Sequence, residues 1–348
     1  MPKSMMIYLS LWSLLVLFPG QSAAAEHRLR ILNWEDYLSP EIVAEFEKLH
    51  NVKVDIFYYE HDEERDELLA TRNGTGYDLV LVDGQSIPGY ARLGWLSPLT
   101  AAEVPNLSLL STWWQNYNPD AIGRVMPYGW GTYGIAYRVD LVEKPVTSFA
   151  QLFKPVSSLQ GKIIMSPQAL ELVPVALQAL GFSMMSHDPR ELEAAEILLK
   201  SQKPYVYRYA ALLLTEKSSL ISGEAHAAMA YSGDAAALQA LNENIRYAEA
   251  EEGQILWFDY WAVLASSTQK ELAYQFLDYL QQPEVNARNA EAIYTATFNE
   301  KAMAYISEET KNNPAVFPTI QPNASYFVEP DTRHLRRIMS VWHDLNIR

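Results

Sequence analysis

Strands and helices alternate along the first part of the chain. Arg28 to Asn33, Val52 to Tyr59 and Tyr77 to Val82 each have the apolar pattern of a strand. Between them, Ser39-Pro40 marks a helix start as N-cap and first helical residue, and Asp66 to Thr71 predicts a second helix. This β-α-β-α-β order predicts an α/β fold with a mostly parallel sheet flanked by helices.

The same pattern continues through the rest of the 348 residues. A chain of this length exceeds one ordinary compact domain, but no Ser/Gly linker divides it. We therefore expect two closely packed lobes, the first from residues 26–133 plus 260–302 and the second from residues 134–259 plus 303–348. Further strands are predicted at Gly161 to Met165 and Ala227 to Tyr231, and further helices after Ser148 and at Leu172 to Leu180, Arg190 to Lys200, Gln269 to Leu280 and Arg336 to Leu345.

The N-terminus has the features of a cleaved export signal. Lys3 precedes an apolar run from Met5 to Phe18, which is shorter than the roughly 20 residues of a membrane-spanning helix. Ala23 and Ala25 supply the small residues of a cleavage site, so we expect residues 1–25 to be a signal peptide. The alternative is a short buried helix. Because the sequence contains no cysteine, we expect no lipid anchor at the cleavage site.

The charge balance excludes one large class of partner. The chain has 27 Lys and Arg against 42 Asp and Glu, for a net charge of −15. Nucleic acids are bound by basic patches, so we expect no nucleic-acid partner. The negative charge is compatible with attracting cations, although it is also typical of proteins that are acidic for solubility alone.

A search for catalytic and metal-binding patterns finds little. The seven histidines are scattered, and there is neither a GxSxG nucleophile elbow nor a Walker loop. Without cysteine, a thiol nucleophile, cysteine-bound zinc and iron–sulfur clusters are excluded. We therefore expect no metal, no cofactor and no enzymatic activity. The alternative is a hydrolase that uses paired acids such as Glu171 and Asp259.

Gly129 to Gly134 matches the GxGxxG pattern of dinucleotide sites. Such a site requires the motif to end a strand and begin a helix. Here Ile135 to Tyr137 continues as a strand instead. We interpret the glycines as positions where the backbone passes close to a neighbour, at a bend between the lobes.

Aromatic residues and carboxylates occur together in three clusters. Trp34-Glu35-Asp36-Tyr37 and Tyr231-Ser232-Gly233-Asp234 each follow a predicted strand, and Trp257-Phe258-Asp259-Tyr260-Trp261 is the third. Ligands of α/β sheets bind at the carboxyl ends of strands. Aromatic faces attract ammonium groups and pack on methylenes, and carboxylates accept charge-assisted hydrogen bonds. The clusters predict a site for an alkyl chain that carries amines. The alternative is aromatic residues in the core and acids in solvent.

These clusters belong to a wider resemblance to the bacterial periplasmic polyamine-binding proteins. The resemblance covers nearly the whole chain after the signal segment. It implies a two-lobe periplasmic solute-binding fold, in which the chain crosses between the lobes more than once and the ligand lies in the interlobe cleft. Besides the clusters, the matching segments include Leu32 to Trp34, Tyr77 to Val80, Pro127 to Thr132, Leu180-Gly181, Glu252-Gly253 and Asn299.

The resemblance also implies a set of ligand-binding residues. By position, the residues that resemble the aromatic walls are Trp34, Tyr37, Tyr231, Trp257 and Tyr294, and those that resemble the polar groups around the amines are Asp36, Glu171, Asp234, Asp259 and Glu329. The chain departs from the family's usual residues at four further site positions, Glu35, Asp83, Gln85 and Gln168.

The departures predict which ligand is preferred. Glu35, Asp36 and Asp83 follow strand ends, so we expect them around one end of the ligand slot, and Gln168 lowers the charge at the other end. Carboxylates at fixed positions can set selectivity, because a misplaced ammonium leaves a buried charge unpaired. We expect triamines to bind more tightly than diamines, with norspermidine as an alternative to spermidine.

The resemblance implies a non-catalytic function. The lobes would close by a hinge on a polyamine of the spermidine, norspermidine and putrescine class, in the periplasm. The bound state would be presented to an ABC transporter permease or, as in the sensor members of the family, to a membrane signalling receptor. The sequence does not separate these two partners, and we expect the protein to be a monomer.

Overall fold

The computed structural model describes residues 27–345, so the predicted signal peptide lies outside the described residues. The strands are β1 Arg28–Trp34, β2 Lys53–Tyr59, β3 Leu79–Asp83, β4 Met126–Arg138, β5 Ile163–Met165, β6 Val206–Tyr209, β7 Ala227–Tyr231, β8 Ile245–Ala248, β9 Ile255–Val263 and β10 Ser325–Tyr326. The helices are α1 Pro40–His50, α2 Asp62–Thr71, α3 Ile87–Arg92, α4 Phe149–Phe153, α5 Ala169–Ala179, α6 Pro189–Gln202, α7 Ser219–Ser222, α8 Ser232–Leu241, α9 Lys270–Leu280, α10 Pro283–Ala292, α11 Glu308–Lys311 and α12 Thr332–Leu345.

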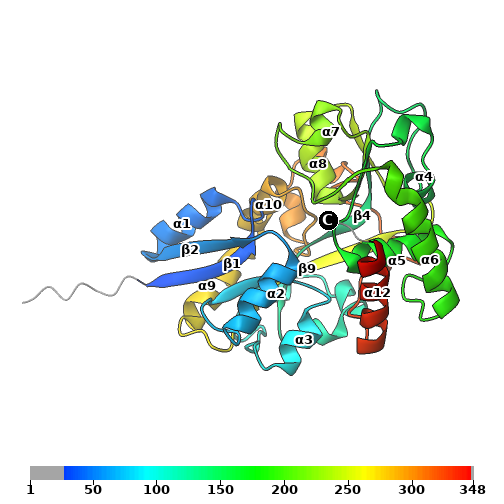
Figure 1. The fold of residues 1–348 in the computed structure, drawn as a ribbon. Helices are drawn as coiled ribbons and strands as arrows, with labels where there is room; N and C mark the ends of the chain where they lie inside the picture. Colours follow the sequence, from blue (N-terminus) through cyan, green and yellow to red (C-terminus); the bar gives the residue numbers. More distant parts are fainter. Residues whose placement is uncertain (1–26, 346–348) are drawn as a thin grey trace, which may run out of the picture.

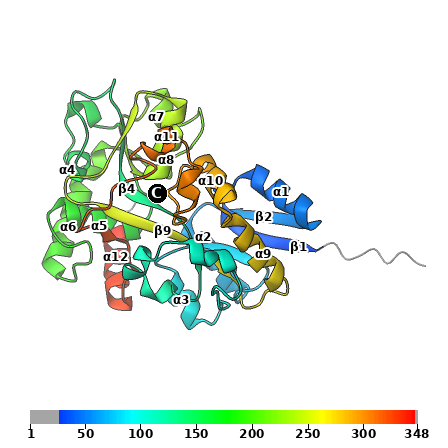
Figure 2. The ribbon, with the colours of Figure 1, turned by 180° about the vertical axis from the view of Figure 1, so that it is seen from behind.

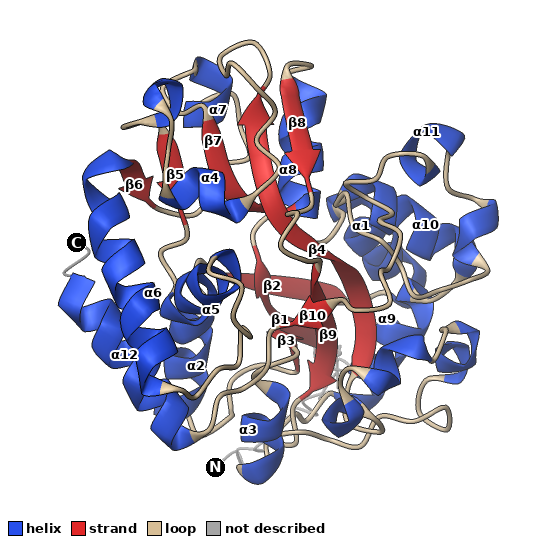
Figure 3. Ribbon diagram, turned by 90° about the vertical axis from the view of Figure 1, so that its right-hand side faces the viewer, coloured by secondary structure: helices blue, strands red, loops and turns tan. Residues whose placement is uncertain are grey.

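The strands form one continuous mixed sheet in the order β2-β1-β3-β9-β4-β7-β5-β6, with β8 pairing β4 and β10 pairing β9 (Figure 3). At one end, β1 is parallel to β2 and β3, and at the other end β5 is parallel to β6 and β7. The two long strands β4 and β9 are antiparallel to each other and to their outer neighbours. Each half is therefore a parallel set of three strands, and the antiparallel strands join the halves.

The two halves have separate hydrophobic cores, which makes this a two-lobe α/β fold. The first core comes from residues 29–130 and 256–298, and the second mainly from residues 133–255 and 338–345. Figures 1 and 2 show β9 running from the lobe with α1, α2 and α9 to the lobe with α5 and α6. Helix α12, red in Figure 1, packs on α5 and α6. The exact lobe boundaries expected from the sequence stay a prediction.

The crossing between the lobes occurs at one level of the paired strands. Trp130 on β4 belongs to the first core and Tyr133 to the second. On β9, Leu256 belongs to the first core and Ile255 to the second, and Tyr133 lies opposite Ile255. A residue on β4 or β9 near this level is therefore placed at the junction of the lobes.

The GxGxxG motif lies entirely within β4 and does not precede a helix. The space at Gly131 shows why this strand needs glycine. A Cβ atom there would lie 2.5 Å from the Ser232 hydroxyl oxygen and 2.7 Å from Cζ2 of Trp257. Such distances are too short for real carbon contacts, so only glycine lets these neighbours approach. The interpretation of the glycines as points of close backbone passage is confirmed.

Two helices begin four residues earlier than the sequence pattern predicts. Helix α2 begins at Asp62, where three acidic residues occupy the first turn and interact favourably with the helix dipole. The backbone N–H of Glu60 donates to the Glu64 carboxylate at 2.8 Å and closes this turn. Helix α12 begins at Thr332, because the Asp331 carboxylate accepts from the backbone N–H groups of Arg333 and His334. Within residues 27–345, no helix has the length and apolar character needed to span a membrane.

Candidate functional site

Four carboxylates follow one another across the junction of the lobes. Asp83 ends β3 and lies directly opposite Asp259 of β9, so their Cβ atoms lie about 4.5–5.5 Å apart on one face of the sheet. Asp259 interacts electrostatically with Asp234 in the first turn of α8, and Asp234 with Glu171 in the first turn of α5. We call Asp83, Asp259, Asp234 and Glu171 the acidic row. It begins in the first lobe and ends in the second.

Asp259 occupies the middle of this row. Its carboxylate accepts a hydrogen bond from the Tyr37 hydroxyl at 2.9 Å. Burial raises the pKa of Asp259 to about 7, and the charges of Asp83 and Asp234 add to this effect against the hydrogen bond of Tyr37. Within residues 27–345, no Lys, Arg or His forms an ion pair with Asp259. Asp259 is thus a half-buried acid that a bound cation would stabilise in its charged form.

Asp234 has even fewer partners. Burial raises the pKa of Asp234 to about 7, and the charge of Glu171 contributes to the rise. The side chain of Asp234 is half-buried. Among the residues that the structure describes, no donor forms a hydrogen bond with its carboxylate. Two neighbouring carboxylates therefore stand at the junction with most of their acceptor positions unused.

Glu171 is buried, with 3% of its surface exposed, and accepts three hydroxyl hydrogen bonds. Tyr133 donates at 2.9 Å, Ser166 at 2.6 Å, and Tyr231 makes a short third bond. Burial raises the pKa of Glu171, and the three hydroxyls only partly oppose this rise. Sequence reasoning missed Tyr133 and Ser166, although Tyr133 lies in the Gly129 to Gly134 motif, directly after the segment Pro127 to Thr132 that resembles the polyamine-binding family.

Aromatic rings line the same region. The rings of Tyr133 and Tyr231 have centroids 4.8 Å apart, and Trp257 meets Tyr231 edge-on at 5.9 Å. The indole N–H of Trp257 donates to the Thr132 carbonyl oxygen at 3.1 Å, which fixes the ring at the lobe crossing. Tyr37 packs edge-on against Tyr128 at 5.5 Å. Tyrosine rings therefore lie beside two carboxylates, Tyr37 beside Asp259 and the pair Tyr133 and Tyr231 beside Glu171.

The other predicted site residues lie around this region in different ways. Trp34 is half-buried at the end of β1 and packs on Tyr59 at 4.5 Å. Tyr294 has a left-handed backbone, and its carbonyl oxygen lies close to Gly233, the residue before Asp234. Of the two glutamines, both half-buried, Gln85 follows β3 and Gln168 is the N-cap residue of α5.

Three predicted acids are exposed, and within residues 27–345 none of them forms a hydrogen bond with the acidic row. Glu35 and Asp36 are exposed in the turn that follows β1. The carboxylate of Glu329 is exposed and pairs with Arg92 at 2.6 Å. No hydrogen bond or ion pair within residues 27–345 joins Glu35 or Asp36 to Asp83, so their place at one acidic end of the slot stays a prediction.

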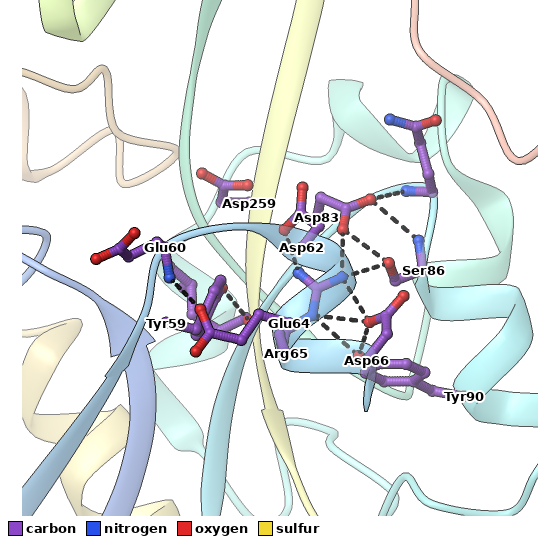
Figure 4. Close-up of polar contacts among 12 residues, drawn as sticks. Tyr59, Glu60, Asp62, Glu64, Arg65, Asp66, Asp83, Ser86, Tyr90 and Asp259 are labelled. Atoms are coloured by element: carbon purple, nitrogen blue, oxygen red, sulfur yellow. Dashed lines mark hydrogen bonds and ion pairs between the residues drawn. The ribbon is translucent and has the colours of Figure 1, made fainter. Parts of the chain in front are cut away.

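A buried arginine that sequence reasoning missed lies beside Asp83. The Arg65 guanidinium is fully buried and contacts the carboxylates of Asp62 at 2.7 Å and Asp83 at 2.8 Å (Figure 4). Burial opposes the charge of Asp83, but Arg65 and the hydroxyl of Ser86 outweigh it and lower the pKa of Asp83. Asp83 is therefore ionised and already paired. Within residues 27–345, no three His, Asp or Glu side chains form a group that could hold a metal ion.

Comparison with known proteins gives a consistent set of relatives. The family model described as bacterial extracellular solute-binding protein matches residues 41–319. A putrescine-binding periplasmic protein of Pseudomonas aeruginosa is 28% identical and covers 90% of this chain and 89% of its own length. A norspermidine sensor of Vibrio cholerae is 29% identical and covers 88% of this chain and 84% of its own length.

The solved structures agree with the fold. A spermidine/putrescine ABC transporter substrate-binding protein of Streptococcus pneumoniae superposes with a TM-score of 0.79 at 24% identity. The alignment covers 92% of this chain and 98% of that one. At this identity the likeness shows the two-lobe solute-binding architecture, which is the fold that the sequence predicted.

Proposed function

The chain belongs to the family of bacterial extracellular solute-binding proteins, and on that premise we propose that it binds a linear polyamine between its two lobes. The observation that carries this proposal is the pair Asp259 and Asp234. Both are half-buried carboxylates whose surroundings raise the pKa to about 7, and neither forms an ion pair with a cation among residues 27–345. Leaving such groups unpaired is unfavourable, and an ammonium group is the partner that would stabilise them.

The aromatic residues suit the rest of such a ligand. The Tyr231 hydroxyl bonds the Glu171 carboxylate, its ring meets that of Trp257 edge-on, and Trp257 lies two residues before Asp259 on the same face of β9. Methylene groups pack on aromatic faces, and a ring face also attracts a nearby ammonium group. A chain of methylenes with an amine at each end would match this arrangement of rings and acids. Relatives that are named for putrescine and norspermidine support the same ligand class.

The placement of the site supports a binding function that depends on closure. The acidic row has members on both lobes, so a ligand that contacts Asp259 and Glu171 would hold the lobes together. We propose that closure presents the loaded protein to a membrane partner in the periplasm, with residues 1–25 removed and no lipid anchor. The partner would be an ABC transporter permease or a signalling receptor, since the relatives include both a substrate-binding protein and a sensor.

The hydrolase alternative has one observation in its favour and one against it. Carboxylates with a raised pKa do lie near each other, as acid catalysis requires. An acid–base pair, however, needs environments that move the two pKa values apart, whereas burial raises the pKa of both Glu171 and Asp259. The matching relatives are named as binding proteins and a sensor. Binding is therefore the better supported function.

Thermal unfolding of the purified protein, residues 26–348, tests the proposal. Putrescine, spermidine and norspermidine are compared with an uncharged sugar and with a neutral amino acid. A ligand at 100 times its Kd stabilises the folded state by about 2.7 kcal/mol, so at least one polyamine should raise the melting temperature measurably. The exposed-acid variant Glu41→Gln serves as a control for general charge effects and should respond like the wild type. If only the sugar or the amino acid raises the melting temperature, the proposal is wrong.

A further inference from the structure

We propose that Asp62 is a further ligand-binding residue of the site between the lobes, and that its carboxylate gives the third ammonium group of a triamine a partner. This inference rests on the proposed function and specifies the ligand of the same site. Asp62 lies in a charged run without an apolar period, so the sequence pattern gives no sign of this role. Its position, its open oxygen and the charges around it carry the inference.

The first step is the position of Asp62. It is the first residue of α2, the helix that follows β2, and an acid at this place interacts favourably with the helix dipole. Because β1 is parallel to both β2 and β3, the carboxyl ends of these strands lie at the same edge of the sheet, where ligands of α/β folds bind. Asp83 ends β3 at this edge, and Figure 4 shows Asp62 beside both Asp83 and Asp259. Asp62 therefore lies at the end of the acidic row that belongs to the first lobe.

The second step is that Asp62 acts on residues of both lobes. In the first lobe, it interacts electrostatically with Asp259. In the second lobe, burial is the main cause that raises the pKa of Tyr231, and the charges of Glu171 and Asp62 add to this rise. Tyr231 packs on the core of the second lobe and bonds Glu171. Asp62 is thus close enough to both lobes to contact a ligand that lies between them.

The third step is that one oxygen of Asp62 is open. Oδ1 accepts from the guanidinium of Arg65 at 2.7 Å, whereas within residues 27–345 no donor forms a hydrogen bond with Oδ2. The side chain is 25% exposed, so neighbouring residues do not seal it. By contrast, both oxygens of Asp83 are occupied, Oδ1 by two backbone N–H groups and Oδ2 by Arg65 and the Ser86 hydroxyl. Asp62 can therefore accept an ammonium group without losing a donor, and Asp83 cannot.

The fourth step is that Arg65 does not satisfy the charge of Asp62. Arg65 is fully buried and is shared by three carboxylates, because it also bonds Asp66 at 2.9 Å and Asp83 at 2.8 Å. One positive charge against three negative charges leaves this end of the site net negative. Burial raises the pKa of Asp62, and the charges of Asp83 and Asp259 add to the rise against that of Arg65. A second cation beside Asp62 would therefore stabilise its charged form.

The placement of Asp62 distinguishes a triamine from a diamine. A diamine that contacts Asp259 and Asp234 leaves Asp62 without a cation of its own. The third ammonium group of a triamine can contact Asp62 while the other two contact Asp259 and Asp234. This contact adds a charge-assisted hydrogen bond, which corresponds to about tenfold in affinity at a partly exposed position.

Calorimetric titration of residues 26–348 with putrescine, norspermidine and spermidine tests this inference. The wild type is expected to bind at least one triamine about tenfold more tightly than putrescine, because only a triamine has an ammonium group left for Asp62. A wild type that binds putrescine as tightly as both triamines would overturn the inference. Absence of binding by all three amines would instead refute the proposed function, so the two failures are distinguishable.

Two variants with matched effects on Arg65 show whether Asp62 itself contacts the ligand. Asp62→Asn and Asp66→Asn each remove one carboxylate charge beside Arg65 and leave it two, but the side chain of Asp66 is 49% exposed. Asp62→Asn should weaken binding of the preferred triamine about tenfold and change that of putrescine by less than about threefold. Asp66→Asn should change neither by more than about threefold, since solvent screens an exposed charge.

Three results would overturn the inference. They are an equal loss for all three amines in Asp62→Asn, no loss in that variant, and a loss of triamine binding in Asp66→Asn as large as in Asp62→Asn. If Asp62→Asn does not fold, the ratio of triamine to putrescine affinity in the wild type still decides the question.

Discussion

Replacing Asp259 with Asn removes a charge from the middle of the acidic row and keeps the shape of the side chain. The new amide oxygen can still accept the hydrogen bond of the Tyr37 hydroxyl, which spans 2.9 Å in the wild type. A bound ammonium, however, would lose its counter-charge. Removing one partner of a buried charge pair typically costs about 2–5 kcal/mol. At about 1.4 kcal/mol per factor of ten, polyamine affinity should fall by about thirtyfold at least.

The same substitution should stabilise the protein without ligand. A rise of the Asp259 pKa from 3.8 to about 7 corresponds to about 4 kcal/mol once the group is ionised. Solvent still reaches the half-buried side chain, so about 2–4 kcal/mol is a reasonable range. Because the pKa is higher in the folded than in the unfolded state, the free energy of unfolding falls as the pH rises from about 4 to about 7. The Asn variant lacks this loss and should be more stable than the wild type at pH 8.

Urea unfolding at pH 5 and pH 8, together with calorimetric titration at pH 8, measures both effects. Glu41→Gln, which removes an exposed acid, is the matched control and should change neither quantity by more than about 0.5 kcal/mol. The reasoning would be refuted by an Asp259→Asn variant that binds the polyamine as tightly as the wild type. It would equally be refuted if the variant lost stability between pH 5 and pH 8 as steeply as the wild type.

Three further predictions concern other parts of the site. Polyamine affinity should weaken as the pH falls from 8 to 5.5, because the pKa of Asp259 and that of Asp234 are both about 7 and protonation removes the ammonium partners. Calorimetry in two buffers of different ionisation enthalpy should therefore detect proton release on binding near pH 6.5, and none if these acids do not contact the ligand. Glu171→Gln should weaken polyamine binding by about tenfold, since it removes a charge that three hydroxyl groups support, and an unchanged Kd would place Glu171 outside the site. Gly131→Ala should lower the free energy of unfolding by about 1–3 kcal/mol in a urea titration, because its Cβ would lie 2.5 Å from the Ser232 hydroxyl, and a neutral effect would show that the strands move apart freely.

Much of the fold follows from local patterns. The apolar alternation of residues 28–34 and the helix signals at Ser39-Pro40 produce β1 and α1 in the positions expected. Ser148 caps α4 through a capping box, and Gly181 adopts the left-handed conformation after α5. These features depend only on residues within a few positions of one another, so the sequence carries them directly.

The pairing of β4 with β9 could not be predicted in this way. Residues 126–138 mix glycines and aromatic residues, so their pattern indicates that they are not one helix but does not show the long strand that forms. The strand is stabilised by its pairing with residues 255–263, far away in the sequence. This contact also places Asp259 at the lobe junction, which the aromatic residues around it could only suggest.

Arg65 shows most clearly where sequence reasoning ended. The segment from His61 to Glu67 contains charged residues without an apolar period, so the sequence pattern predicts a helix only from Asp66. Because α2 begins at Asp62, Arg65 instead lies inside the helix, on the face toward β3 and Asp83. A charged run is usually solvated, and only the tertiary contact with Asp83 shows that this arginine is buried. The spacing of Asp62 and Arg65 was the one local signal available.

A crystal structure of residues 26–348 grown with putrescine would test the central claim most directly. The account predicts the diamine between the lobes, with one ammonium nitrogen about 2.7–3.2 Å from an oxygen of Asp259 and the other at a similar distance from Asp234 or Glu171. Arg65 and Asp83 should keep their contact of 2.8 Å. Putrescine bound away from Asp259, or an ammonium in contact with Asp83 in place of Arg65, would contradict the account.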